Sequence, residues 1–142
     1  MKGYLHFENG ESFVGNMIDD CSVLTAEGGI EFYTGMTGYQ DVLTDPSKKN
    51  QIIVFTYPLI GNCGFSELDF NMKPQVAGVI LYETKDFHSH YEGKYSLRQY
   101  LQKWNVPMIS HVDTRAVVKR IRDKKIEKAV ISNQPALAGA LI

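Results

Sequence analysis

The sequence predicts an α/β domain in which antiparallel strands come first and a parallel part of the sheet comes late. Two observations lead to this expectation. The first third of the chain carries short alternating apolar segments with glycine-containing turns, which are typical of antiparallel hairpins. The last third alternates apolar strand segments with helical patterns, and such units place their strands in parallel. No linker composition appears before residue 132, so we expect one domain over residues 1–132.

Composition limits the function classes. The 142 residues are 44% hydrophobic and 22% charged, as in globular domains with a core, and the net charge of -1 offers no general attraction to nucleic acid or anionic lipid. The longest apolar runs fall far short of the roughly 20 residues that span a bilayer. Cys21 and Cys63 are too few for a disulfide framework. We therefore expect a cytoplasmic protein without nucleic-acid or membrane partners.

The N-terminal residues 3–17 predict a β-hairpin. Leu5 and Phe7 face one side of an alternating segment, and Asn9-Gly10 follows it. Asn-Gly between alternating segments favours a type I′ turn, in which both central residues have positive φ.

Gly28-Gly29 predicts a break before a strand over residues 30–34, whose neighbours we expect to be other strands with an exposed face. Residues 35–50 lack apolar periodicity and predict either a long connection or a short helix between loops. Connections of this length in a compact domain are usually functional.

Two apolar segments in the middle of the chain predict buried strands. Residues 51–57 are rich in β-branched and aromatic side chains and stop at Pro58, and residues 76–82 have the same character. Residues 83–95 are polar and predict surface structure.

The C-terminal third predicts two helices and two strands. The first helix has a capping box at Ser96 and ends at Pro107; its apolar residues, spaced i, i+3, i+4 and i+7, are Leu97, Tyr100, Leu101 and Trp104. A strand over 108–112 and a second helix capped by Asp113 or Thr114 follow, the helix carrying the apolar residues Val117, Val118 and Ile121. Residues 128–132 predict a last strand, and residues 133–142 resemble the start of a connection to something else.

Three features suggest chemistry, each beside a plainer interpretation. Cys63 follows a buried strand and, with His111 and Asp113, is a candidate nucleophile, although its surroundings lack the Gly-x-nucleophile-x-Gly pattern and a packed thiol is favoured. His88 and His90 have the spacing of two metal ligands, but nothing in the sequence completes the set, so surface histidines are favoured. The basic segment 115–125 is better explained as a solvated or partner-facing surface than as a nucleic-acid site.

The loop after the third predicted strand carries a family resemblance. Residues 32–47, FYTGMTGYQDVLTDPS, and residues 51–62, QIIVFTYPLIGN, closely resemble the N-terminal domain of the small subunit of glutamine-hydrolysing carbamoyl-phosphate synthetase. Further matches in the same order are Gly3-Tyr4-Leu5, Glu8-Asn9-Gly10, Phe13 and Val112-Asp113-Thr114-Arg115. The resemblance covers nearly the whole chain.

This resemblance implies a fold and a place in a larger enzyme. The expected fold is a three-layer β/β/α swivelling-type domain with mixed parallel and antiparallel sheets. In that family a C-terminal glutaminase domain with a Cys-His-Glu set releases ammonia from glutamine. The large subunit then uses ATP and Mg²⁺ to make carbamoyl phosphate for arginine and pyrimidine synthesis. Residues 133–142 would then begin the linker to the glutaminase domain, and the chain alone would carry no cofactor and no activity.

The resemblance also implies site residues. Ser47 corresponds to a serine that reaches the substrate glutamine across the domain interface, and a hydroxyl suits this role because it donates and accepts hydrogen bonds. Thr37, Gly38, Tyr39 and Gln40 are expected to support its loop. Two departures from the family pattern are Cys63, where relatives commonly carry an aromatic or aliphatic residue, and the more basic Lys48-Lys49-Asn50 beside Ser47.

Three hypotheses of different classes follow. The first is a non-catalytic module that scaffolds the glutaminase domain, contributes Ser47 to its glutamine site and contacts the large subunit. The second is a small hydrolase that uses Cys63 and His111. The third is a stand-alone interaction domain with no small-molecule site. The choice between arginine-specific and pyrimidine-specific enzymes stays open at this point.

Overall fold

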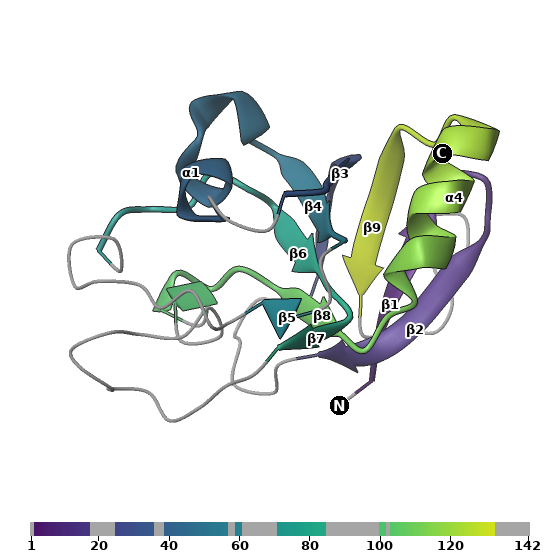
Figure 1. Ribbon diagram of the computed structural model, residues 1–142, viewed down its shortest axis with the longest axis horizontal. Coiled ribbons are helices and arrows are strands. Elements are labelled where there is room, and N and C mark those ends of the chain that lie inside the picture. Colours follow the sequence, from purple (N-terminus) through teal and green to yellow (C-terminus); the bar gives the residue numbers. More distant parts are fainter. Residues whose placement is uncertain are drawn as a thin grey trace.

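A computed structural model describes residues 2–17, 25–35, 39–56, 59–60, 71–84, 100–101 and 103–132. Seven strands close into a barrel in the order β1-β2-β8-β6-β4-β3-β9 (Figure 1). They are β1 (Lys2–Phe7), β2 (Ser12–Met17), β3 (Ala26–Tyr33), β4 (Gln51–Phe55), β6 (Gly78–Ile80), β8 (Met108–Ser110) and β9 (Lys128–Ser132). The short strands β5 (Leu59–Ile60) and β7 (Glu83–Thr84) pair separately in parallel. The helical elements include α1 (Tyr39–Thr44), the 3₁₀ helix η1 (Pro46–Lys48) and α4 (Thr114–Lys124).

The strand directions confirm the α/β class with parallel and antiparallel pairing in one sheet, and the parallel part begins earlier in the chain than expected. The parallel pairs in this sheet are β3–β4, β4–β6 and β6–β8, so the expected late parallel unit is present at β6–β8 and two further parallel pairs precede it. The last strand, β9, is antiparallel to both β1 and β3, so it closes the barrel between the N-terminal hairpin and the parallel strands. The prediction of a late parallel portion is therefore wrong for β9.

The N-terminal hairpin is confirmed, with a different turn. Gly10 has a φ of 94°, whereas Asn9 is not left-handed. The Gly10 N–H donates to the carbonyl of Phe7 at 3.0 Å, and the Phe7 N–H donates to the carbonyl of Glu11 at 2.8 Å. This is the pattern of a type I turn followed by a glycine bulge. Asn9 contributes its side chain instead, since its Oδ1 accepts from the Glu11 N–H at 3.0 Å.

Gly28 and Gly29 lie inside β3, so the predicted break is wrong. A Cβ on Gly28 would lie 2.0 Å from the carbonyl oxygen of Asn50, and one on Gly29 would lie 2.5 Å from Oε1 of Gln51. The two glycines thus permit β3 to approach the start of β4. The neighbours of β3 are β4 and β9, whose residues are mostly buried, and not strands with an exposed face.

Backbone geometry also changes where other elements end. The strand predicted over 108–112 stops at Ser110 because His111 has a left-handed φ of 61°. The predicted helix is present at residues 100, 101 and 103, whereas residues 96–99 lie outside the described residues. It ends before Asn105, which has a φ of 55°, and the following Val106 N–H donates to the carbonyl of Leu101 at 2.9 Å. The helix therefore ends in a left-handed cap before Pro107 is reached.

The two buried strands predicted in the middle of the chain are shorter than expected, whereas the last strand, β9, has the predicted bounds. The strand over 51–57 is β4, which ends at Phe55, and the strand over 76–82 is β6, with three residues. Within the segment 83–95, predicted as surface, Glu83 and Thr84 form β7, and the rest lies outside the described residues.

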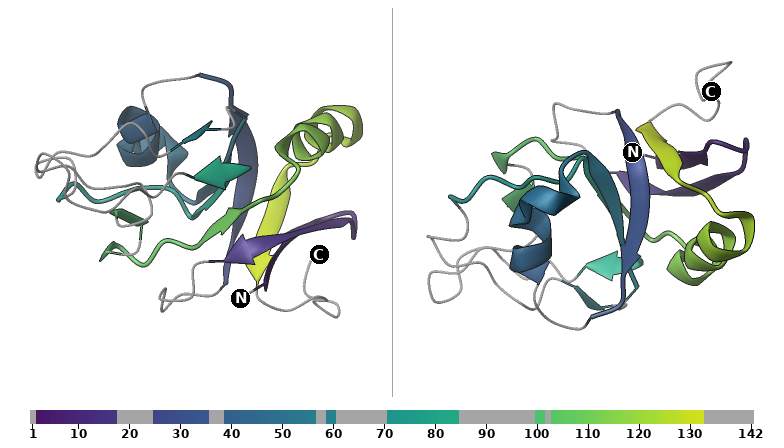
Figure 2. Two further views of the ribbon diagram at one scale, coloured as in Figure 1. Left: turned by 60° about the horizontal axis from the view of Figure 1, so that its bottom comes forward. Right: turned by 90° about the horizontal axis from the view of Figure 1, so that it is seen from above.

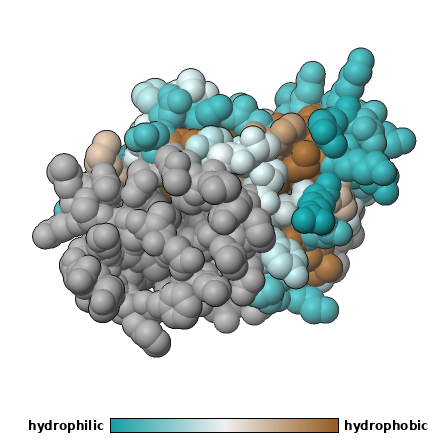
Figure 3. Space-filling model, in the orientation of Figure 1, coloured by the Kyte–Doolittle hydropathy of each residue, from teal (hydrophilic) through white to brown (hydrophobic). Residues whose placement is uncertain are grey.

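The second predicted helix, α4, is confirmed together with its cap. Oδ1 of Asp113 accepts from the Ala116 N–H at 3.1 Å. Val117 and Ile121 are buried, while the basic residues of the helix are exposed. Hydrophilic residues cover the outward side of the molecule where α4 lies (Figure 3).

The parallel strands separate two apolar clusters. Ile53 and Phe55 of β4 belong to a cluster that includes Val42 and Leu43 of α1 together with Tyr100. The alternate residues of β4, Ile52 and Val54, belong to a second cluster with Leu5, Phe7 and the buried apolar residues of α4. Helices α1 and α4 accordingly lie on opposite sides of β4 (Figures 1 and 2). Burial on both faces explains why the segment is continuously apolar.

Candidate functional site

Ser47 lies at the centre of η1, the 3₁₀ turn between α1 and β4. No residue of η1 is buried, and Ser47 itself is exposed. Pro46 stands at the first position of the turn, where its fixed φ suits a helical start. The hydroxyl of Ser47 is therefore presented at the surface by a very short helix.

Asp45 caps this helix. Its Oδ1 accepts from the Ser47 N–H at 2.9 Å, and its carbonyl accepts from the Lys48 N–H at 2.9 Å. Hydrogen bonds from the backbone and then the side chain of Ser47 hold the pKa of the Asp45 carboxyl below its usual range, and the positive charge of Lys48 adds to this effect. The same aspartate thus fixes the backbone of Ser47 and contacts its side chain.

The residues on both sides of the turn tie it to the core. Val42 and Leu43 of α1 are buried, and the Leu43 carbonyl accepts from the Gln75 N–H at 2.7 Å. After the turn, Asn50 adopts a left-handed φ of 63°, and its N–H donates to the Gln75 carbonyl at 3.3 Å. Residues 42–50 therefore form a loop whose base is fixed at both ends and whose tip carries Ser47.

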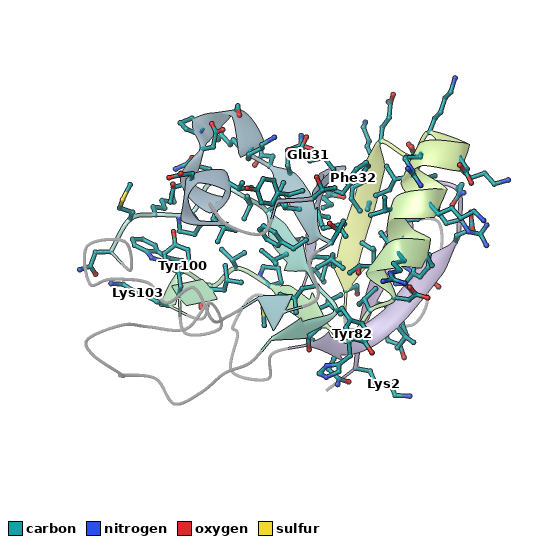
Figure 4. All side chains as sticks on the ribbon, in the orientation of Figure 1. Lys2, Glu31, Phe32, Tyr82, Tyr100 and Lys103 are labelled. Atoms are coloured by element: carbon teal, nitrogen blue, oxygen red, sulfur yellow. The ribbon has the colours of Figure 1, made fainter. Side chains whose placement is uncertain are left out.

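An ion pair connects the tip to the sheet. Nζ of Lys48 lies 2.7 Å from Oε1 of Glu31 on β3. Glu31 projects from the sheet beside the ribbon that leads towards β4 (Figure 4). The sequence patterns do not reveal this pair, because Lys48 stands out only as a departure from the family pattern and Glu31 only as a polar strand position.

The four residues expected to support the Ser47 loop are described in part. Tyr39 and Gln40 form the first turn of α1, which leads directly to the Ser47 loop, but their side chains lie outside the described set. Thr37 and Gly38 lie outside the described residues altogether.

A shallow hollow of about 280 Å³ lies on another part of the loop base. Its lining comes from residues 49–50, 73–77 and 104–107, and Ser47 does not contribute to it. The exposed serine therefore does not open into this hollow.

The hydrolase hypothesis combines Cys63 with His111 and Asp113. The two described members of this set, His111 and Asp113, give it no support. Asp113 is engaged as the cap of α4. Nδ1 of His111 lies 2.9 Å from Oγ of Ser110 and 3.4 Å from Nδ2 of Asn16. No hydrogen bond joins Asp113 to His111 in the described part of the chain. Cys21, Cys63, His88 and His90 lie outside that part.

The described ranges contain neither a cluster of metal ligands nor a membrane-spanning helix. Within them, no three His, Cys, Asp or Glu side chains gather as a metal site requires. No helix in the same ranges has both the length and the apolar character needed to cross a membrane.

Comparison with known proteins defines the class as a domain of a carbamoyl-phosphate synthase. Residues 5–131 match the family model described as carbamoyl-phosphate synthase small chain, CPSase domain. The chain therefore belongs to the carbamoyl-phosphate synthase small-chain family, as the resemblance implies.

Individual relatives agree with this family. The chain is 59% identical over 125 residues to the carbamoyl phosphate synthase arginine-specific small chain of Bacillus subtilis, covering 86% of this chain and 34% of the relative. It is 53% identical over 139 residues to the arginine-specific small chain of Geobacillus stearothermophilus, covering 97% and 39%. With the carbamoyl phosphate synthase small chain of Caldanaerobacter subterraneus the identity is 42% over 136 residues, covering 95% and 38%. The chain thus spans between 34% and 39% of the length of these relatives.

Proposed function

We propose that this chain is the N-terminal domain of the glutamine-hydrolysing small subunit of a carbamoyl-phosphate synthase that serves arginine synthesis. The family match over residues 5–131 supports the domain assignment. The arginine branch is supported by the names of the two relatives with 59% and 53% identity, both of which are arginine-specific small chains.

Within that subunit, the domain contributes Ser47 to the glutamine site. The observation that carries this proposal is the exposed Ser47 hydroxyl on a turn that Asp45 caps and the core fixes at both ends. With its proton donated to Asp45, the hydroxyl oxygen can accept from the amino group of glutamine without adding charge. The rest of the glutamine site comes from the glutaminase domain.

The remaining parts of the reaction belong to other domains. Residues 1–132 scaffold the glutaminase domain, and residues 133–142 begin the connection to it. The Cys-His-Glu set of that domain hydrolyses glutamine. The large subunit, the partner in a cytoplasmic heterodimer, uses ATP and Mg²⁺ to make carbamoyl phosphate. This division predicts that the 142-residue chain alone is inactive.

The experiment for this proposal is to isolate the native protein from its source cells with an antibody against this domain. We expect a polypeptide far heavier than the 16.0 kDa of this chain, recovered with a large ATP-binding subunit. That complex should form carbamoyl phosphate from glutamine. A native species of 16.0 kDa without such a partner would favour the stand-alone interaction domain instead.

One substitution distinguishes the hydrolase alternative from the proposed function. Cys63→Ala in the complete complex should leave glutamine hydrolysis unchanged, because the proposed nucleophile lies in the glutaminase domain. Loss of hydrolysis in Cys63→Ala with the complex intact would favour the rival hydrolase.

A further inference from the structure

The ion pair between Glu31 and Lys48 lies where it can fix the orientation of Ser47. Lys48 is the last residue of η1 and follows Ser47 directly, and its Nζ lies 2.7 Å from Oε1 of Glu31. The Asp45 cap holds the beginning of the same turn. Ser47 therefore lies between two fixed points, one at each end of a three-residue helix.

Glu31 is held in place by the pairing of its strand with β4. It lies opposite Ile53 of β4, whereas the antiparallel pairing of β3 with β9 covers residues 26–29 and stops before Glu31. The connection therefore runs from a paired strand of the sheet to the exposed tip of the loop, and Lys48 lies 17 positions after Glu31 in the sequence.

The pair differs from an ordinary surface ion pair in the burial of one atom. The side chain of Glu31 is 39% exposed and that of Lys48 is 32% exposed. Oε1 of Glu31, however, is shielded from solvent and makes no hydrogen bond within the described residues, so the Lys48 ammonium at 2.7 Å is its charged neighbour there. Removal of the Lys48 ammonium would leave this buried carboxylate oxygen without its counter-charge, and such an oxygen draws in water or moves outwards. Either response would displace the turn that carries Ser47.

We propose that Glu31 and Lys48 are positioning residues that fix the orientation of the Ser47 hydroxyl towards glutamine. The inference rests on the proposed role of Ser47 in the glutamine site. Neither residue touches the substrate. Lys48 acts through the backbone of η1, and Glu31 acts through Lys48.

The test uses the full-length small subunit assembled with its large subunit. Lys48→Met and Glu31→Gln should each raise the KM for glutamine about three- to tenfold, because misplacement of a binding group weakens the complex. The rate with ammonia supplied directly should be unchanged, which also shows that the variant complex is folded. Lys48→Arg should keep most of the wild-type KM, since a guanidinium can pair with the same carboxylate.

Lys49→Met is the matched control. Lys49 is the next residue, it is exposed, and it makes no ion pair in the described part of the chain. The same charge is therefore removed one position away from the pair, and the KM for glutamine should not change.

Combination with Ser47→Ala separates this inference from the proposed function. If Lys48→Met acts through Ser47, it should add little to the KM of Ser47→Ala. A raised KM in Ser47→Ala, with Lys48→Met and Glu31→Gln no different from Lys49→Met, would overturn the positioning role and leave the glutamine-site role intact. A normal KM in Ser47→Ala would overturn both.

Discussion

The backbone N–H of Ser47 donates to Oδ1 of Asp45 at 2.9 Å, so the proposed glutamine-contacting residue is held by the carboxylate that caps its own helix. Loss of that carboxylate leaves the first turn of η1 without its acceptor. Because no residue of η1 is buried, packing of the helix itself against the core does not replace the lost cap.

Asp45→Ala should therefore weaken glutamine binding without affecting the synthetase reaction. We expect a several-fold rise in the KM for glutamine in the complete enzyme, because an exposed three-residue helix without a cap samples other conformations. Activity with ammonia should stay the same. Asp41→Ala, which removes an exposed aspartate of the preceding helix α1, is the control. Equal KM values for the two variants would contradict the role of the cap.

The pH dependence of the cap follows from the lowered pKa of Asp45. Hydrogen bonds from Ser47 lower this pKa below its ordinary value of 3.8, so ionised Asp45 favours the folded state. Its contribution is complete above the unfolded pKa and is lost as the pH falls from about 3.8 through the lower folded pKa.

We expect the unfolding midpoint of the wild-type small subunit to exceed that of Asp45→Asn at pH 6, with the difference shrinking below pH 4. Denaturant unfolding at a series of pH values measures this change. A difference between the two unfolding midpoints that grows as the pH falls would contradict the claim that ionised Asp45 stabilises the folded state.

Gly28→Ala should destabilise the domain because its Cβ would lie 2.0 Å from the Asn50 carbonyl oxygen. We expect a loss of about 1–3 kcal/mol in the free energy of unfolding, as for other overpacking substitutions. Gly10→Asn is the contrast. Gly10 has a φ of 94° with no atom within 4 Å of the position that a Cβ would take, and asparagine tolerates positive φ better than most residues. A smaller loss is therefore expected for Gly10→Asn in the same urea titration.

Asp113→Ala should destabilise α4 by about 1 kcal/mol, because the Ala116 N–H loses its 3.1 Å acceptor. Asp123→Ala, on the last part of the same helix, should be neutral or slightly stabilising, since a negative charge near a helix C-terminus opposes the dipole. Urea unfolding of both variants checks whether Asp113 acts as the N-cap of α4. A loss of glutamine hydrolysis in Asp113→Ala with unfolding unaffected would instead point to the His111 arrangement.

Sequence patterns correctly predict the elements that depend on residues close together in the sequence. The hairpin follows from alternation around Asn9-Gly10, and α4 follows from its cap at Asp113 and its apolar spacing. The break predicted at Gly28-Gly29 is wrong because the reason for Gly28 is the approach of Asn50, 22 residues later in the sequence. The antiparallel pairing of β9 likewise depends on partners near the start of the chain.

The candidate site likewise combines a contact between neighbouring residues with a contact between residues far apart in the sequence. Ser47 is predicted through the family resemblance, and its cap by Asp45 is a local contact within the Asp-Pro-Ser segment. The Glu31–Lys48 pair is beyond prediction, because it depends on the parallel alignment of β3 with β4. No periodicity in the sequence specifies that alignment.

The most direct test of the central claim is the KM for glutamine of Ser47→Ala in the complete two-subunit enzyme, with Ser12→Ala on β2 as the control. Both serines are exposed, but only Ser47 lies on the capped turn. We predict a KM for glutamine about tenfold above wild type for Ser47→Ala, as expected for the loss of one substrate hydrogen bond of about 1.4 kcal/mol. Ammonia-dependent synthesis should be normal in both variants. A KM for Ser47→Ala equal to that of Ser12→Ala would contradict the claim that this domain contributes to the glutamine site.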